Sequence, residues 1–144
     1  GTLKYGNILL IFLMVLVWIT DTAAYFIGEK FGSHRNIFKA SKKKSIEGFV
    51  AGIISAFVFA FMLNLLISAI WNFRLLTDWK DILVYGIIVG IFGQLGDLME
   101  SNLKRDFQVK DTSKLLPGHG GILDRFDSLM VSAPILYFYF VFIR

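Results

Sequence analysis

The chain has 144 residues, of which 56% are hydrophobic and 18% charged, and it has a net charge of +4, two prolines and no cysteine. Soluble domains are about 45–50% apolar and about 25% charged. The composition therefore excludes an ordinary soluble domain, and also a disordered, collagen-like or disulfide-rich secreted protein. Without cysteine there is no thiol nucleophile and no thiolate metal site. An integral membrane protein remains, with only a handful of spans of about 20 residues each.

The first two apolar segments predict two membrane-spanning helices. Residues 6–28 contain one charged residue, Asp21, and residues 48–73 contain none. The first segment is not a cleavable signal peptide, because its apolar run is long and no small-residue cleavage site follows a basic start. The chain begins with Gly rather than Met, which indicates a fragment or a processed product.

The third and fourth apolar segments are shorter. Residues 82–96 carry no charge, and at about 1.5 Å per residue they cover only about two-thirds of a bilayer core. This segment must therefore continue helically through Asp97 or lie where the membrane is indented. Residues 128–143 form the fourth segment. The predicted fold is an all-α, polytopic transmembrane bundle of about four spans, in one membrane domain covering residues 1–144.

Lysine and arginine are unevenly distributed, which predicts the orientation of the bundle. Residues 29–47 and 97–127 hold eleven of the fifteen Lys and Arg residues. Two spans separate these loops, so both lie on the same side of the membrane. Because cytoplasmic loops are enriched in Lys and Arg, we expect both loops to face the cytoplasm from the inner membrane. Alternatively, the positive charge only sets this topology and attracts anionic lipid headgroups, without a specific partner.

Acidic residues follow two of the apolar runs. Asp21 and Asp97 lie near the predicted cytoplasmic ends of their spans. Keeping a charged side chain close to hydrocarbon costs free energy, so such residues usually have a function. A single interfacial Asp can also cap a helix or pair with a lysine. If the helix continues past Asp97, then Asp97, Glu100, Ser101 and Lys104 share one face. An acid, a hydroxyl and a cation would then point into the same region.

The segment 101–127 combines cations, glycines and acids. Its Gly-His-Gly-Gly string offers backbone N–H groups that can approach an anion closely, although such a string alone is more often a turn. With its charged neighbours it indicates magnesium and polyphosphate chemistry, because Mg²⁺ takes oxygen ligands and leaves positions for water and phosphates. Asp97 and Asp124 could supply the carboxylates. Without cysteine a zinc site is not expected, and we expect His119 to bind a phosphate or orient the loop.

The same segment carries a family resemblance. It reads S-x-x-K-R-x-x-x-x-K-D from Ser101 to Asp111 and P-x-H-G-G-x-x-D-R-x-D from Pro117 to Asp127. This pattern resembles the signature of the phosphatidate cytidylyltransferase family, also called CDP-diacylglycerol synthases.

A second stretch resembles the family's other cytoplasmic motif. It contains D-T-A-A-Y from Asp21 and continues from Ser41 through Lys44-Ser45-Ile-Glu-Gly. Lys42 stands where the family usually has Pro. Family members typically have further spans on the N-terminal side, so the chain resembles their C-terminal catalytic part.

The resemblance implies that CTP and phosphatidate are converted to CDP-diacylglycerol and pyrophosphate, with Mg²⁺ and optionally a second cation such as K⁺. The implied partners are CTP, the lipid and the bilayer, with a homo-oligomer as an option and no nucleic acid. The expected metal ligands are Asp97 and Asp124. The expected catalytic residues are Asp97, Lys104, Arg105, Asp124 and Arg125. The expected substrate-binding residues are Asp21, Lys44, Ser45, Ser101, Lys110, Asp111, Gly118, His119, Gly120, Gly121 and Asp127.

Two alternatives stay open from the sequence. A related membrane enzyme acting on another lipid, such as a CDP-archaeol synthase or a polyprenol or phytol kinase, would resemble this architecture. We do not expect such an enzyme to share the whole H-G-G-x-x-D-R-x-D string. A transporter or channel module would use intramembrane acids as an ion path, but it would not explain the glycine-rich string.

Overall fold

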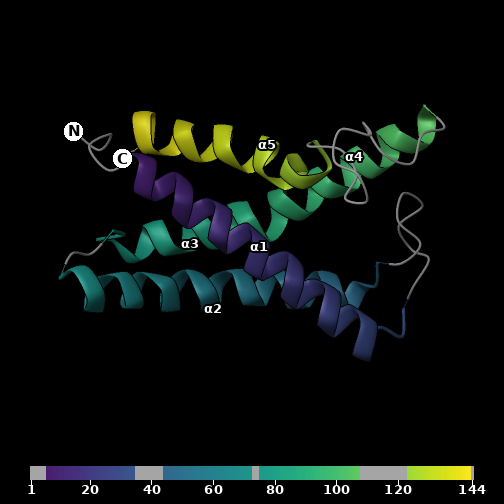
Figure 1. Ribbon diagram of the computed structural model, residues 1–144, viewed down its shortest axis with the longest axis horizontal. Coiled ribbons are helices and arrows are strands. Elements are labelled where there is room, and N and C mark those ends of the chain that lie inside the picture. The colour runs from purple at the N-terminus through teal and green to yellow at the C-terminus, as the bar shows by residue number, and fades with distance from the viewer. Residues whose placement is uncertain (1–5, 35–43, 73–74, 108–122, 144) are drawn as a thin grey trace.

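The computed structural model describes residues 6–34, 44–72, 75–107 and 123–143, and every regular element among them is a helix (Figure 1). Two of these elements, η2 and η3, are π-helical turns. In chain order the elements are α1 (Gly6–Phe31), α2 (Ile46–Trp71), α3 (Trp79–Ile87), η2 (Ile88–Gly93), α4 (Gln94–Asp106), α5 (Leu123–Phe138) and η3 (Tyr139–Ile143).

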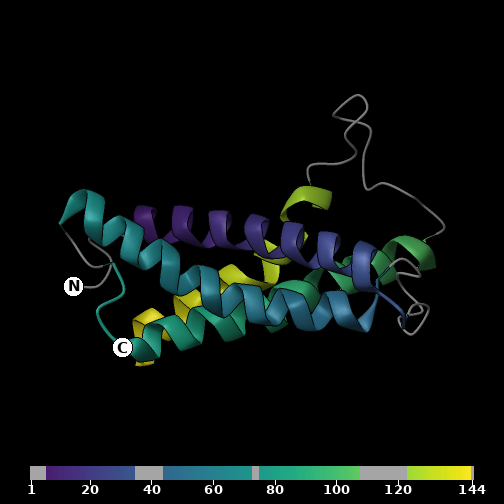
Figure 2. The same cartoon turned by 90° about the horizontal axis from the view of Figure 1, so that it is seen from below.

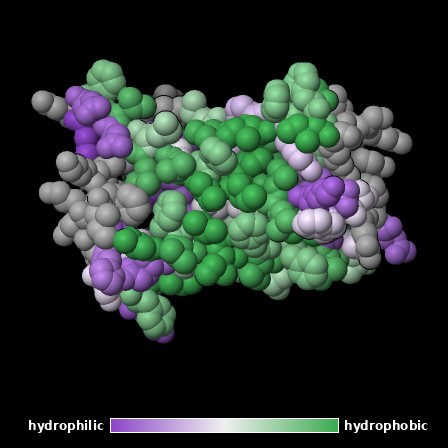
Figure 3. Space-filling view, turned by 180° about the vertical axis from the view of Figure 1, so that it is seen from behind, coloured by the Kyte–Doolittle hydropathy of each residue, from purple (hydrophilic) through white to green (hydrophobic). Residues whose placement is uncertain are grey.

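Four of the described helical stretches are long and apolar enough to cross a membrane, which confirms the predicted all-α bundle. Apolar side chains cover the middle of the surface, and polar ones gather towards its two ends (Figure 3). A soluble protein rarely exposes so much apolar surface, so the chain is a multi-pass membrane protein. The four stretches are Gly6–Phe31, Ile46–Ile70, Trp79–Asp106 and Phe126–Ile143.

The third span runs helically through Asp97, the first of the two alternatives that the sequence left open. Its first part, α3, packs on α2, whereas its last part, α4, packs on α5 (Figure 1). The π-helical turn η2 lies between them and contacts both α2 and α5. As a result the predicted loop 97–127 is helical up to Asp106 and again from Leu123.

Glycines let the helices approach closely, as small residues commonly do in membrane bundles. A Cβ atom on Gly28 of α1 would lie 3.3 Å from the Cα of Gly48 on α2. A Cβ on Gly96 of α4 would lie 2.9 Å from the backbone oxygen of Asp127 on α5. The second approach brings the residue after Gly96, Asp97, towards α5.

The helix ends divide the molecule into two regions. The end of α1, the start of α2 and the end of α4 lie towards one end, which we call the site end (Figures 1 and 2). The start of α1 and the end of η3 lie at the other end, which we call the opposite end. The helices that flank the two basic loops thus meet at the site end, in keeping with loops on one side of the membrane.

The opposite end is fixed by buried polar contacts. The Asn64 side chain donates to the Leu76 backbone oxygen at 3.1 Å and accepts from the Leu76 backbone N–H at 3.0 Å. The Tyr139 hydroxyl donates to Asp81 Oδ1 at 2.9 Å. In a membrane such groups need internal partners, and these bonds join α2 to the connection before α3, and α3 to η3.

Candidate metal and phosphate site

Three carboxylates from two helices meet in the half of the third span nearer the site end. Oxygens of Asp97 and Glu100 on α4 and of Asp127 on α5 all lie within 4.8 Å of one another. Asp97 and Glu100 are one helical turn apart and so share a face, and the close approach at Gly96 adds Asp127. We call Asp97, Glu100 and Asp127 the acidic cluster. Carboxylates this close repel one another strongly unless cations neutralise them.

Two lysines supply positive charge to the cluster. Lys44 Nζ forms an ion pair with Asp97 Oδ2, and Lys104 Nζ lies 3.2 Å from Glu100 Oε2. Lys104 reaches Glu100 because the two residues are four positions apart on α4. Glu100 is only 8% exposed, so its pairing with Lys104 takes place largely away from water.

The backbone position of Lys44 follows from the cap of α2. Ser45 is the N-cap residue, and its buried hydroxyl accepts a hydrogen bond from the Gly48 backbone N–H at 3.1 Å. A serine at this position satisfies one of the free N–H groups of the first helical turn. Lys44 directly precedes this cap, so the start of α2 places it beside α4.

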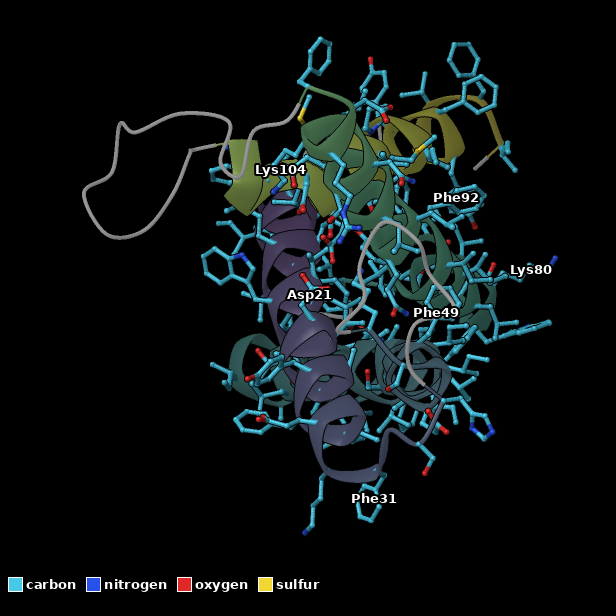
Figure 4. The ribbon with its side chains drawn as sticks, turned by 90° about the vertical axis from the view of Figure 1, so that its right-hand side faces the viewer. Asp21, Phe31, Phe49, Lys80, Phe92 and Lys104 are labelled. Carbon is cyan, nitrogen blue, oxygen red and sulfur yellow. The ribbon has the colours of Figure 1, made fainter. Side chains whose placement is uncertain are left out.

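Asp21 adds a fourth carboxylate, from α1. It interacts electrostatically with Asp97, Asp127 and Lys44, and its side chain is exposed. Figure 4 looks into the site end and shows Asp21 on α1 beneath Lys104 of α4. The contacts and electrostatic interactions described here involve four carboxylates and two ammonium groups, so this group carries a formal charge of −2 when all are ionised.

The structure brings together five of the residues predicted from the sequence: Asp21, Lys44, Asp97, Lys104 and Asp127. Of the others, Ser45 caps α2, Ser101 is half-buried on α4, and Arg105 is exposed on α4. Six predicted residues lie outside the described residues: Lys110, Asp111, Gly118, His119, Gly120 and Gly121.

Asp124 and Arg125 lie in the first turn of α5, but their side chains are outside the described part of the chain. The predicted metal pair of Asp97 and Asp124 therefore stays a prediction. Glu100 was not among the predicted site residues, although it shares a helix face with Asp97 in the sequence pattern. That spacing was the signal that could have identified it.

The donor set of the cluster fits a hard divalent cation. Magnesium takes carboxylate oxygens and usually keeps several positions for water and substrate phosphates. Asp97, Glu100 and Asp127 offer three such oxygens from two helices, and Asp124 lies one turn before Asp127 on α5. The two lysines beside the carboxylates are suited to phosphate oxygens. The site can therefore hold a cation and a phosphate side by side.

Comparisons with known proteins show which family the sequence resembles. A family model described as "Cytidylyltransferase family" matches residues 1–143. The chain is 42% identical over 135 residues to a phosphatidate cytidylyltransferase of Bacillus subtilis (strain 168), covering 94% of this chain and 48% of the relative. It is 44% identical over 127 residues to one of Staphylococcus haemolyticus (strain JCSC1435), covering 88% of this chain and 46% of the relative. The chain thus spans about half the length of the curated relatives it matches.

Proposed function

Because the chain belongs to the cytidylyltransferase family, we propose that the complete protein transfers the cytidylyl group of CTP to phosphatidate. The products are CDP-diacylglycerol and pyrophosphate, and the reaction depends on Mg²⁺. The observation that carries the proposal is the acidic cluster on two membrane-spanning helices, with its two lysines. The names of the similar proteins support the choice of CTP and phosphatidate.

In this reaction an oxygen of the lipid phosphate attacks the α-phosphorus of CTP. The bond from that phosphorus to the oxygen bridging to the β-phosphate breaks, and pyrophosphate leaves with the electron pair. The lipid phosphate is largely ionised near neutral pH, so no general base is needed. The protein must align two mutually repelling anions and neutralise the leaving group.

The residues of the site divide this work between them. Asp97, Glu100 and Asp127 would hold Mg²⁺, together with Asp124 as the sequence predicts. When bound, the metal neutralises charge on the phosphates and on the departing pyrophosphate. Lys44 and Lys104 bind phosphate oxygens and hold the two substrates against each other. The remaining predicted contacts, from Arg105, Lys110, Arg125 and the 118–121 string, bind the nucleotide phosphates.

The position of the acidic cluster on membrane-spanning helices suits a reaction between a lipid, phosphatidate, and a soluble substrate, CTP. The acidic cluster lies on helices that span the membrane, within reach of a lipid phosphate arriving from the bilayer. CTP would enter from the site end, which we propose faces the cytoplasm because the basic loops flank it. A soluble transferase would not need its carboxylates on membrane-spanning helices.

The test is pyrophosphate release by the complete protein in detergent or liposomes. We expect release to require CTP, phosphatidate and Mg²⁺ together. An ether-linked phosphatidate analogue, tested in parallel, separates this activity from that of an enzyme that uses ether lipids. If CTP with phosphatidate gave no pyrophosphate while another lipid acceptor did, the proposed substrate would be wrong.

A further inference from the structure

The two lysines of the site occupy the carboxylates that a metal ion would need. Lys44 pairs with Asp97, and Lys104 pairs with Glu100 at 3.2 Å, while oxygens of both acids belong to the acidic cluster. An ammonium group and a divalent cation cannot share one carboxylate oxygen without strong repulsion. Each carboxylate also has a second oxygen, but a divalent cation bound there still repels the nearby ammonium group, so metal binding weakens these ion pairs.

The charge of the site indicates where the lysines go. Among the described residues of these interactions, four carboxylates outnumber two ammonium groups, so this part of the site favours a cation over a polyphosphate. A bound divalent cation cancels the formal charge of −2. It also places two positive charges next to the lysines, which become free to bind an anion.

Lysine is suited to such a change of partner. Its ammonium group is a point charge at the end of a flexible four-carbon stem, so it can swing between acceptors while its backbone stays in place. The backbone of Lys44 is held next to the cap of α2 by the hydrogen bond from Gly48 to Ser45, and that of Lys104 lies within α4. Only the side chains need to move.

We propose that Lys44 and Lys104 exchange partners during binding. They pair with Asp97 and Glu100 in the structure, and when a divalent cation takes those carboxylates the lysines turn to the phosphates of the nucleotide. This inference rests on the proposed function. It makes cation and nucleotide binding cooperative, with the cation entering first or together with the nucleotide. The alternative is a brace, in which Lys44 stays on Asp97 and only orients it.

The experiment measures binding and not turnover, using the complete protein in detergent and Mn²⁺ as a spectroscopic substitute for Mg²⁺. The variant is Lys44→Met, which keeps the apolar stem and removes the charge. Exchange predicts opposite changes for the two ligands. Mn²⁺ alone should bind at least about threefold tighter because its competitor is gone. CTP, measured with saturating Mn²⁺, should bind about tenfold more weakly because a charge-assisted contact is lost.

The matched control is Lys30→Met. Lys30 lies in the last turn of α1, with its ammonium group 5.4 Å from the centre of the Phe31 ring. Its substitution removes the same charge as Lys44→Met without removing an ion pair to the acidic cluster. We expect both affinities to stay near wild type. Thermal unfolding of each variant verifies that the protein is folded, and Lys44→Arg should restore CTP binding in part.

Three results would overturn the exchange. Weaker Mn²⁺ binding in Lys44→Met would favour the brace, because Asp97 would then have lost its orientation. Unchanged CTP binding would mean that Lys44 does not turn to phosphate. If Lys30→Met changed the Mn²⁺ and CTP affinities equally, both changes would be long-range effects of removing a positive charge. If the wild type releases pyrophosphate and one of these results is found, only the exchange fails. If the wild type binds no Mn²⁺, the metal part of the proposed function fails with it.

Discussion

Carboxylates are buried in both halves of the bundle, but they have different partners. At the opposite end, Asp81 is 1% exposed, and it accepts hydrogen bonds from the Tyr139 hydroxyl at 2.9 Å and the Asp78 backbone N–H at 3.4 Å. Near the site end, Glu100 is 8% exposed and pairs with Lys104, and the half-buried Asp97 beside it pairs with Lys44. Burial of a carboxylate therefore does not by itself separate the structural region at the opposite end from the proposed functional region at the site end.

The difference lies in what can be displaced. A hydroxyl and a backbone N–H are neutral donors fixed by the fold, so they hold Asp81 in one position. A lysine side chain is mobile, and neighbouring carboxylates repel, so Asp97 is in a place where a cation gains by entering. An acid in a membrane-spanning helix marks a binding site when other charges share its surroundings. Substitutions at both ends of the molecule test this contrast.

The largest effect should follow from removing one carboxylate of the acidic cluster. Asp97→Asn keeps the shape of the side chain and removes a charged ligand, so we expect pyrophosphate release to fall by at least about 100-fold. The matched control is Asp106→Asn, an exposed acid at the end of the same helix, which should stay within a few-fold of wild type. Equal losses in the two variants would contradict the site.

The next effect should come from separating α4 and α5. A Cβ on Gly96 would lie 2.9 Å from the Asp127 backbone oxygen, so Gly96→Ala must push the two helices apart. Because a displacement of about 1 Å at a site can cost about 100-fold, we expect Mn²⁺ binding to weaken at least about tenfold. Gly6→Ala, where a Cβ meets nothing within 4 Å, should leave binding unchanged. Unaltered Mn²⁺ affinity in Gly96→Ala would show that the close approach does not build the site.

At the opposite end, removing the partner of a buried carboxylate should lower the stability of the protein and leave its activity unchanged. Tyr139→Phe removes the hydroxyl that donates to Asp81 Oδ1. Losing the donor to a buried acceptor costs about 1–3 kcal/mol, and we expect thermal unfolding to shift down accordingly. Pyrophosphate release per folded protein should stay within about twofold. Tyr137→Phe, on the exposed side of the same segment, serves as the control and should change neither property.

The smallest effect concerns an exposed ion pair at the site end that does not include the acidic cluster. His34 Nδ1 lies 2.6 Å from Glu47 Oε1, across the connection between α1 and α2, and the His34 ring is largely exposed. Exposed ion pairs contribute little to stability, so Glu47→Gln should leave thermal unfolding and Mn²⁺ affinity unchanged. A loss of Mn²⁺ affinity would show that this connection also positions Lys44.

The sequence predicted the helical class and the four spans, because long apolar runs permit little else in a membrane. It also placed Asp97 and Lys104 on one helix face, since helical spacing fixes which residues are neighbours. It did not predict the π-helical turn η2, which depends on how the third span passes from α2 to α5. The contact of Lys44 with Asp97 joins segments far apart in the chain, and spacing carries no information on such pairs.

The central claim is that a divalent cation binds at the acidic cluster. It is tested most directly by the anomalous scattering of Mn²⁺ in crystals of the complete protein. The account predicts a peak between the carboxylates of Asp97, Glu100 and Asp127. A peak elsewhere, or none at these carboxylates at Mn²⁺ concentrations that support pyrophosphate release, would contradict it.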